Sequence, residues 1–81
     1  PLGGGTTNIG RHPNSDIVLD DITVSRRHAQ VVYQDGGFFV RDVGSLNGTY
    51  VNQQRTEEAR LYHGDEVQVG KFRLVFFDRT E

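Results

Sequence analysis

Short apolar runs alternate with turn-forming residues along this chain from Thr7 onward. The runs cover residues 8–10, 17–19, 28–33, 38–40, 49–51, 66–69 and 71–77. Several of them alternate apolar and polar side chains with the two-residue period of a half-buried strand, and none is long enough for a typical helix. Regularly spaced short strands predict an all-β protein, built as an antiparallel β-sandwich or barrel.

Glycine marks the predicted connections between these strands. Asp35-Gly36-Gly37 lies between two apolar runs, and glycine reaches the positive φ values that tight hairpins need. Asn47-Gly48 precedes the predicted strand at 49–51, and Gly70 separates the last two runs. These residues predict a hairpin at 35–37 and turns at 47–48 and at Gly70.

Two segments depart from this pattern. Residues 55–61 have a helix-compatible composition but no clear cap and no repeated apolar stripe, so a loop with at most one helical turn is expected there. Residues 1–6 are glycine-rich and predict a linker or the remnant of a purification tag. The domain is therefore expected to span residues 7–77, with a short tail at 78–81.

Length, composition and charge limit the functions open to this chain. Its 81 residues make one small domain, in which any cleft must be shallow. It has no cysteine, which excludes disulfides and thiolate metal sites and suits a reducing, cytoplasmic setting. A formal net charge of −2 argues against bulk attraction to nucleic acid or to a membrane. No apolar run approaches the roughly 20 residues of a membrane span, and no basic-then-apolar leader opens the chain, so a soluble, unsecreted protein is expected.

Candidate chemistry is concentrated in three clusters at strand ends or turns: Gly10-Arg11, Ser25-Arg26-Arg27-His28 and residues 45–49. Because the loops of a sandwich collect at its ends, these clusters could converge. A phosphate dianion needs charge-assisted donors, which arginine guanidinium groups and a serine hydroxyl supply. The amide of Asn47 can both donate to and accept from a peptide backbone. Together the clusters predict a site for a phosphate and for the peptide that carries it.

Each cluster also has an ordinary structural interpretation. The arginines could be solvated surface charges, Asn47-Gly48 could be only a turn, and Gly10 could mark a bulge or a close backbone approach. His28 begins a strand and precedes Ala29, which favours a buried imidazole bonded to a neighbouring loop over a catalytic base. A structural role is therefore predicted for His28.

In their order along the chain, Gly10-Arg11, Ser25-x-x-His28 and Asn47-Gly48-Thr49 resemble the signature of forkhead-associated (FHA) domains. The similarity continues through residues 15–17, 19–20, 24–29, 42–52 and 64–70, and it extends from about Thr7 to Phe77. This resemblance implies an FHA-type antiparallel β-sandwich with phosphopeptide-binding loops at one end. It also implies that the chain reads phosphothreonine and needs no cofactor.

The resemblance carries roles to matching residues. Arg11 and Ser25 would bind the phosphate, and Arg26 would bind the phosphate or the flanking peptide. Asn47 would hold the peptide backbone. Three further residues would support the site without contacting the ligand: Gly10, His28 and Gly48. Among them, His28 would brace the loop that presents Ser25, and Gly48 would allow the turn that places Asn47.

Two features depart from the family pattern. Leu46 stands where many members carry a hydroxyl residue, so an apolar contact would replace a phosphate contact and lower the affinity. Residues 1–6 do not resemble the strand that usually precedes the glycine–arginine pair, so this strand is missing or the chain is trimmed. The chain is most similar to small actinobacterial FHA proteins regulated by Ser/Thr kinases. Such proteins read phosphothreonine made by these kinases, dock the kinases, and can inhibit metabolic enzymes when unphosphorylated.

The sequence leaves three functions of the chain to compare. The main prediction is recognition of a phosphothreonine segment, in a Ser/Thr kinase or its substrate, with no nucleic acid or membrane partner. The alternative is a phospho-independent docking module that binds and regulates a metabolic enzyme, and both functions could coexist. A hydrolase built on Ser25, His28 and Asp42 is disfavoured, because residues three apart on an extended chain tend to point to different faces. The adjacent acids at 20–21 and 57–58 indicate solvated loop charge, so no metal site is expected.

Overall fold

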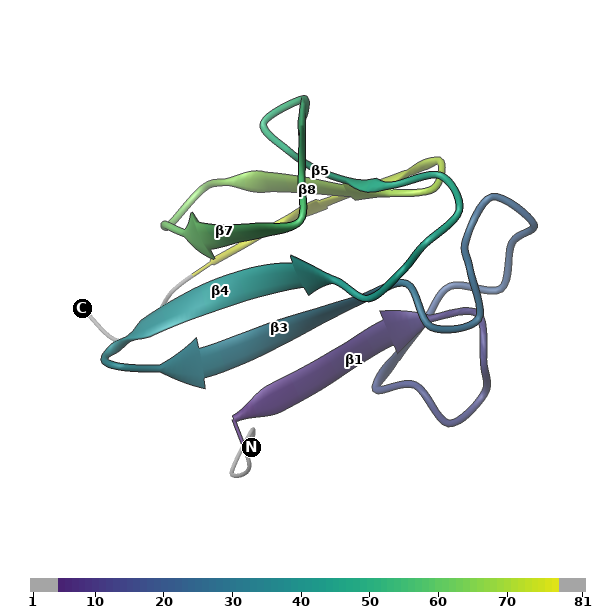
Figure 1. Ribbon diagram of the computed structural model, residues 1–81, viewed down its shortest axis with the longest axis horizontal. Coiled ribbons are helices and arrows are strands. Elements are labelled where there is room, and N and C mark those ends of the chain that lie inside the picture. Colours follow the sequence, from purple (N-terminus) through teal and green to yellow (C-terminus); the bar gives the residue numbers. More distant parts are fainter. Residues whose placement is uncertain (1–4, 78–81) are drawn as a thin grey trace.

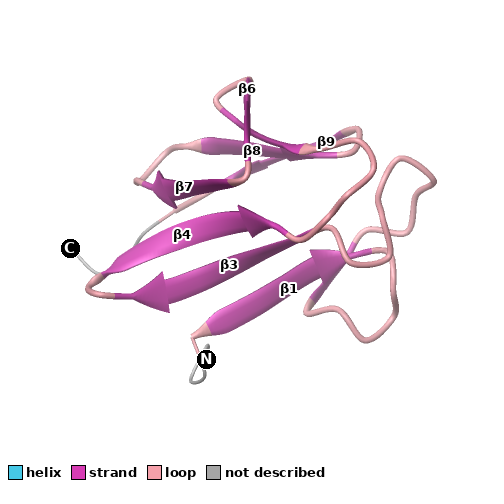
Figure 2. Ribbon diagram, viewed as in Figure 1, coloured by secondary structure: helices cyan, strands magenta, loops and turns pink. Residues whose placement is uncertain are grey.

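The computed structural model describes residues 5–77, which form nine β-strands and no helix (Figures 1 and 2). No helix in this described part is therefore long and apolar enough to cross a membrane. The strands are β1 (Thr6–Gly10), β2 (Ile17–Val18), β3 (Ala29–Gln34), β4 (Gly37–Asp42), β5 (Thr49–Val51), β6 (Gln54–Thr56), β7 (Glu58–Leu61), β8 (Glu66–Val69) and β9 (Phe72–Val75).

The strands form two sheets that pack against each other as a sandwich (Figure 1). One sheet has the order β2-β1-β3-β4-β7, and the other has the order β6-β5-β8-β9. Neighbouring strands are antiparallel except β1 and β2, where Ile9 lies opposite Ile17 in a parallel pair. The predicted all-β antiparallel sandwich is confirmed, with this one short parallel pair at the edge of the larger sheet.

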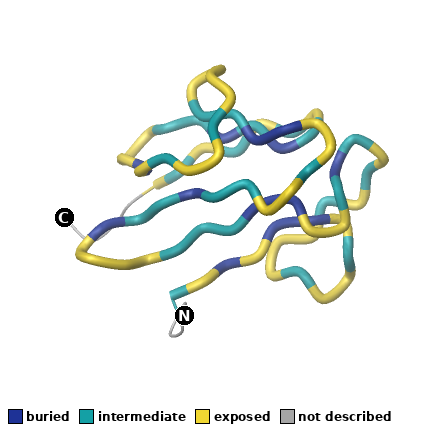
Figure 3. Tube along the Cα trace, in the orientation of Figure 1, coloured by how far each residue is buried: buried dark blue, intermediate teal, exposed yellow. Residues whose placement is uncertain are grey.

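The core lies between the sheets and comes from alternate residues of the strands (Figure 3). In β8, Val67 and Val69 are buried while the residues between and before them are half-buried. They belong to the same apolar cluster as Val40 of β4. Burying such a side chain contributes roughly 1.5–3 kcal/mol, so these residues determine which face of each strand turns inward. Two polar side chains, His28 and Thr49, are buried as deeply as the core.

Two-residue turns connect β3 to β4 and β5 to β6. Asp35 and Gly36 have positive φ angles of 53° and 78°, as a hairpin turn that matches the twist of its strands requires. This confirms the hairpin predicted at 35–37, with Gly37 as the first residue of β4. Asn52 and Gln53, with φ angles of 49° and 71°, make a similar turn between β5 and β6 that the sequence pattern did not predict.

The loop predicted at residues 55–61 is wrong. Residues 55–56 belong to β6, and the next strand, β7, pairs with β4. The composition of this segment suits a helix, but β7 buries Leu61 and half-buries Ala59 while the residues beside them stay exposed. That two-residue period fits a strand on the edge of a sheet. Pairing with β4 satisfies the backbone groups, so tertiary context overrides a weak local preference.

The ends of several strands differ from the predictions. β1 begins at Thr6 and β9 ends at Val75, whereas the apolar runs predicted strands at 8–10 and 71–77. The carbonyl oxygen of Gly5 accepts from the amide of Tyr33 at 2.7 Å, so pairing with β3 reaches back to this residue. Apart from Gly5 and Thr6, the predicted linker at 1–6 and the tail at 78–81 lie outside the described residues and stay predictions.

Three loops gather at one end of the sandwich, on the right in Figure 1. Loop A joins β1 to β2 (residues 11–16), loop B joins β2 to β3 (19–28), and loop C joins β4 to β5 (43–48). They carry the three predicted clusters, two of which extend into the adjoining strands at Gly10 and Thr49. The expected gathering of loops at one end is confirmed, and it brings the candidate chemistry to a single surface.

Candidate functional site

Arg11 holds loop A against loop B. Its backbone amide donates to the carbonyl of Ser25 and its Nε donates to the carbonyl of Val24, both at 3.0 Å. Because the guanidinium is planar, the bond at Nε fixes the orientation of the whole group. Its terminal amino groups form no bond with any residue between 5 and 77, and Arg11 is exposed. Arg11 therefore presents oriented cationic donors at the loop end.

Ser25 links loop B to loop C. Its Oγ accepts from the backbone amide of Leu46 at 2.9 Å, and the residue is half-buried. Since the hydroxyl acts as an acceptor in this bond, its hydrogen can still be donated to a ligand oxygen. The carbonyl of Ser25 is also the acceptor for the Arg11 amide. The guanidinium of Arg11 and the hydroxyl of Ser25 are therefore both held beside the backbone of residues 24–25.

His28 braces loops B and C from inside the protein. It is 0% exposed, its Nδ1 accepts from the amide of Ser25 at 3.1 Å, and its Nε2 lies 2.8 Å from the carbonyl oxygen of Gly48. An accepting Nδ1 requires the proton on Nε2, so a neutral ring donates to Gly48. The predicted buried imidazole, bonded to a neighbouring loop, is therefore confirmed, and it links loop B to loop C.

Asn47 is oriented by loop B. Its Nδ2 donates to the carbonyl of Thr23 at 2.9 Å. Asp21 in turn accepts at Oδ2 from the hydroxyl and the amide of Thr23, at 2.5 and 2.9 Å, and pairs with Nζ of Lys71 at 3.2 Å. These Thr23 bonds, the hydroxyl first, together with Lys71 lower the pKa of Asp21 to about 2. With one N–H engaged, Asn47 keeps its amide oxygen and its second N–H for a peptide backbone.

Asp42 shapes loop C from the end of β4. Its Oδ1 accepts from the amides of Gly44 and Ser45 at 2.7 and 2.8 Å, and its Oδ2 accepts from the hydroxyls of Ser45 and Thr49 at 2.5 and 3.0 Å. The Ser45 hydroxyl also accepts from the amide of Gly48 at 2.9 Å. Burial raises the pKa of Asp42, but the bonds from Ser45, Gly44 and Thr49 outweigh it and lower the pKa. An ionised Asp42 therefore closes the turn at the tip of loop C.

We expect the substitution Asp42→Asn to destabilise the domain by about 1–3 kcal/mol at neutral pH, because its amide NH₂ cannot accept from the two hydroxyls. A carboxyl with a lowered folded-state pKa contributes stability above its ordinary pKa, which is 3.8 for Asp42, and loses it as the pH falls through the folded value. Thermal unfolding of the wild type and of Asp42→Asn should therefore show a difference in stability that is constant down to about pH 5 and narrows below it. A stability difference of the same size at every pH would contradict this role.

Two glycines are required where the loops approach one another. A Cβ on Gly10 would collide with the backbone carbonyl of Arg26, which cannot move aside as a flexible side chain can. Gly48 has a φ of 89°, in a region that other residues rarely adopt, and its carbonyl is the one that His28 contacts. The supporting roles expected of Gly10 and Gly48 therefore have a steric basis.

The side chains of two predicted ligand-binding residues, Arg26 and Leu46, form no part of this hydrogen-bond network. Leu46 is 85% exposed. The carbonyl of Arg26 accepts from the amide of His12 at 3.2 Å, but its guanidinium forms no bond within residues 5–77. The structure thus joins Arg11, Ser25 and Asn47 through hydrogen bonds and leaves the side chains of Arg26 and Leu46 at the surface of the loops.

Several residues that hold the loops in shape were not predicted in this role. Asp21 and Thr23 orient Asn47, while Asp42 and Ser45 close loop C. A local signal existed for both pairs, because an aspartate often accepts from backbone amides two or three residues further on. No such signal existed for Lys71, whose amide donates to the Thr23 hydroxyl at 3.0 Å from 48 residues away.

The atoms that a Ser–His–Asp hydrolase needs are engaged in other bonds. Ser25 meets His28 through its backbone amide, and the second ring nitrogen of His28 contacts the carbonyl of Gly48. Asp42 bonds within and beside loop C. A triad needs the serine hydroxyl on the imidazole and the imidazole on the carboxylate, so this arrangement argues against the hydrolase. Within residues 5–77, no cluster of three or more histidine, aspartate or glutamate side chains could hold a metal ion.

Comparison with known proteins gives consistent matches over most of the chain. The FHA domain family model matches residues 7–70. The oxoglutarate dehydrogenase inhibitor of Corynebacterium diphtheriae is 66% identical over 73 residues, which cover 90% of this chain and 51% of that protein. The glycogen accumulation regulator GarA of Mycolicibacterium smegmatis is 66% identical over 71 residues, which cover 88% of this chain and 45% of GarA. The chain spans about half the length of these curated relatives.

A solved structure shares the fold. Mycobacterium tuberculosis EmbR, in complex with a low affinity phosphopeptide, matches with a TM-score of 0.87 at 34% identity. The match covers 90% of this chain and 20% of EmbR. The two-sheet architecture described above is therefore also that of a protein whose structure contains a bound phosphopeptide.

Proposed function

Because this chain belongs to the FHA domain family of phosphothreonine-binding modules, we propose that its loop end binds phosphothreonine segments of partner proteins. The resemblance found in the sequence is confirmed, including the similarity to small actinobacterial FHA proteins. The matching family and relatives are binding and regulatory proteins. The observation that carries the proposal is the hydrogen-bonded junction that holds Arg11, Ser25 and Asn47 at one end of the sandwich.

The phosphate would lie between Arg11 and Ser25. The terminal amino groups of Arg11 would neutralise the dianion, and the Ser25 hydroxyl would donate a further hydrogen bond. The bond from Nε to the Val24 carbonyl holds the guanidinium in place beforehand, so less side-chain freedom is lost on binding. The exposed Arg26 would add positive charge toward the phosphate or the flanking peptide.

Asn47 and Leu46 would contact the rest of the peptide. Asn47 would bond to the peptide backbone through its amide oxygen and its second N–H. The exposed Leu46 would offer an apolar contact. A preference for threonine over serine needs burial of the γ-methyl group, which is worth about 0.8 kcal/mol and therefore roughly fourfold in affinity.

The proposal is tested by titrating the domain with three peptides of one sequence, taken from a kinase activation loop. One carries phosphothreonine, one carries phosphoserine, and one carries unmodified threonine. We expect binding to the phosphorylated peptides alone, with phosphothreonine favoured roughly fourfold over phosphoserine. Equal affinity for the phosphorylated and unmodified threonine peptides would contradict the proposal.

A second function is favoured by similarity to a known enzyme inhibitor. The protein from Corynebacterium diphtheriae is named an oxoglutarate dehydrogenase inhibitor and is 66% identical to this chain. We propose that this domain also docks, without phosphate, onto a metabolic enzyme and regulates it. Two exposed apolar residues, Ile22 at 91% and Leu46 at 85% exposure, support a protein contact at loops B and C.

The partners and setting follow from the proposed ligand. Because phosphorylation creates the ligand, the expected partner is a Ser/Thr protein kinase or a kinase substrate. We place the domain in the cytoplasm, where such a kinase would modify its partner. We further propose that the domain acts by binding alone, as a module that is not an enzyme.

A further inference from the structure

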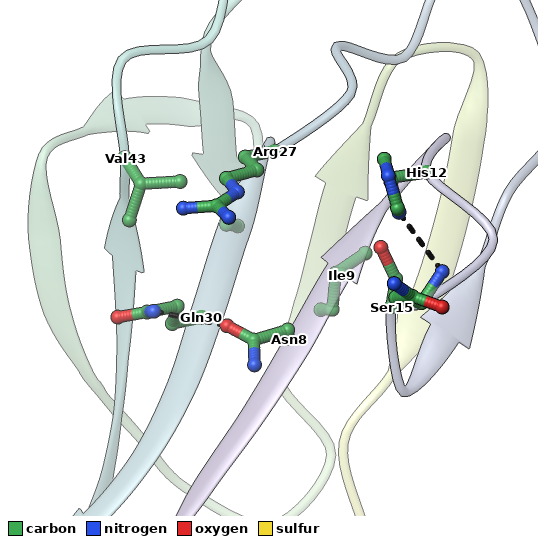
Figure 4. A pocket seen from close by; sticks show the side chains of 9 residues that line it. Asn8, Ile9, His12, Ser15, Arg27, Gln30 and Val43 are labelled. Atoms are coloured by element: carbon green, nitrogen blue, oxygen red, sulfur yellow. Dashed lines mark hydrogen bonds between the residues drawn. The ribbon is translucent and has the colours of Figure 1, made fainter.

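A cleft of about 560 Å³ lies beside loops A and B, over the ends of β1 and β3 (Figure 4). Its polar lining comes from His12, Asn14 and Ser15 in loop A, Arg27 in loop B, and Asn8 and Gln30 in the strands. The cleft has the volume of a site for a small ligand or for a few side chains. None of these residues takes part in the proposed phosphate site.

Arg27 gives this cleft an uncompensated positive charge. Its guanidinium forms no hydrogen bond or ion pair with any residue between 5 and 77, and it extends from loop B on the opposite side of the cleft from His12 (Figure 4). Arg27 is the one aspartate, glutamate, lysine or arginine among the residues that line the cleft. Gln30 Nε2 donates to Asn8 Oδ1 at 2.9 Å, and His12 Nδ1 accepts from the backbone amide of Asn14 at 3.0 Å. Asp16, the acid next to the cleft in sequence, is outside its lining; its Oδ2 accepts from the backbone amide and the Nδ2 of Asn8, at 2.7 and 3.5 Å. The arrangement suits a ligand carboxylate.

Consecutive residues of loop B connect the cleft to the phosphate site. The carbonyl of Thr23 accepts from Asn47. The carbonyls of Val24 and Ser25 both accept from Arg11. The carbonyl of Arg26 accepts from the amide of His12, and the next residue, Arg27, lines the cleft. A segment such as residues 23–27 spans at most roughly 14 Å. The cleft is therefore within reach of an extended peptide whose phosphate is held by Arg11, on the side away from Asn47.

Resting on the proposed function, we propose that this cleft binds an aspartate or glutamate of the same partner segment, within about four residues of the phosphothreonine. Arg27 would donate to the carboxylate, and the Ser15 hydroxyl offers a further donor. Val43, which is 38% exposed and also lines the cleft, would contact the methylene groups of a glutamate. Arg27 would thus select acidic phosphothreonine segments, a preference that the phosphate site alone does not supply.

The test is a set of phosphothreonine peptides with alanine at all flanking positions, in which one glutamate is moved through four positions on each side, and a parallel set in which one lysine is moved instead. Binding is measured for the wild type and for Arg27→Ala and Arg27→Glu. Arg73→Ala serves as the control, because it removes the same charge from β9, where Arg73 pairs with Glu66 at 3.4 Å. Thermal unfolding verifies that each variant, changed at an exposed residue, is folded.

We expect glutamate to tighten wild-type binding about twofold to fivefold at one or more positions on one side only. Arg27→Ala should lose this gain, Arg73→Ala should keep it, and Arg27→Glu should prefer lysine at the same positions. The proposal is overturned if glutamate gives no gain at any position, or if Arg27→Ala keeps the gain. The all-alanine phosphopeptide tests the proposed function separately. If it binds and glutamate adds nothing, only the cleft assignment fails, whereas binding by no phosphorylated peptide overturns both.

Discussion

Replacing Arg11 by alanine is expected to weaken binding of a phosphothreonine peptide by at least about 100-fold. Arg11 supplies oriented cationic donors, and its loss would leave the dianion facing Ser25 without its main counter-charge. Because the side chain is exposed and makes a single internal bond, the unfolding temperature should fall by only a few degrees. Isothermal titration of the folded variant measures the effect.

Two matched variants separate the geometry of Arg11 from its charge. Arg11→Lys keeps the positive charge but loses the planar donor pair and the bond to the Val24 carbonyl, so an intermediate loss of about tenfold is expected. Arg73→Ala changes the net charge equally and should bind as the wild type does. If Arg11→Ala binds within a few-fold of the wild type, another group holds the phosphate, and Arg26 becomes the first candidate.

The Arg11→Ala variant also distinguishes the two proposed functions. Docking onto a metabolic enzyme without phosphate does not require a counter-charge for a dianion, so inhibition by this variant should persist. If both functions use the loop end, a saturating phosphothreonine peptide should relieve the inhibition by wild-type protein but not that by Arg11→Ala. Loss of inhibition in a folded Arg11→Ala protein would mean that Arg11 belongs to the docking surface as well.

The fold was predictable where local chemistry and burial agree. The hairpin at 35–37 combines a turn sequence with apolar runs on both sides, and it forms as predicted. Residues 55–61 show the limit of this reasoning. Their strand character depends on pairing with β4 and on burial of Leu61 by distant residues, neither of which is visible in the segment itself.

The sequence pointed to the ligand-facing groups of the candidate site and to three of their supports, but not to the others. A phosphate and a peptide call for arginine, serine and asparagine, which marked three clusters, and the family resemblance selected Arg11, Ser25 and Asn47 within them. What orients Asn47 depends on a contact between loops, the bond from its Nδ2 to the Thr23 carbonyl. Such contacts arise from the sandwich bringing loops B and C together, which no spacing along the chain encodes.

Replacing His28 by alanine is expected to have the largest effect on stability, with a loss of about 3–5 kcal/mol. The change opens a cavity at a residue that is 0% exposed, and it leaves the Ser25 amide and the Gly48 carbonyl without their partner. At several degrees per kcal/mol for a domain of this size, the unfolding temperature should fall by at least about 12 °C. Differential scanning calorimetry measures this change directly.

Two isosteric variants, His28→Asn and His28→Gln, keep the test informative even if His28→Ala does not fold. The amide oxygen of asparagine can occupy the position of Nδ1 and accept from Ser25, while the amide nitrogen of glutamine can occupy that of Nε2 and donate to Gly48. Each variant therefore restores one of the two loop contacts, and each should be more stable than His28→Ala. Because the site needs loops B and C at a fixed spacing, both should still bind phosphothreonine peptide more weakly than the wild type. If either variant is folded and binds with wild-type affinity, the imidazole bridge does not set the spacing of the site, and the bonds from Leu46 to Ser25 and from Asn47 to Thr23 are sufficient to do so.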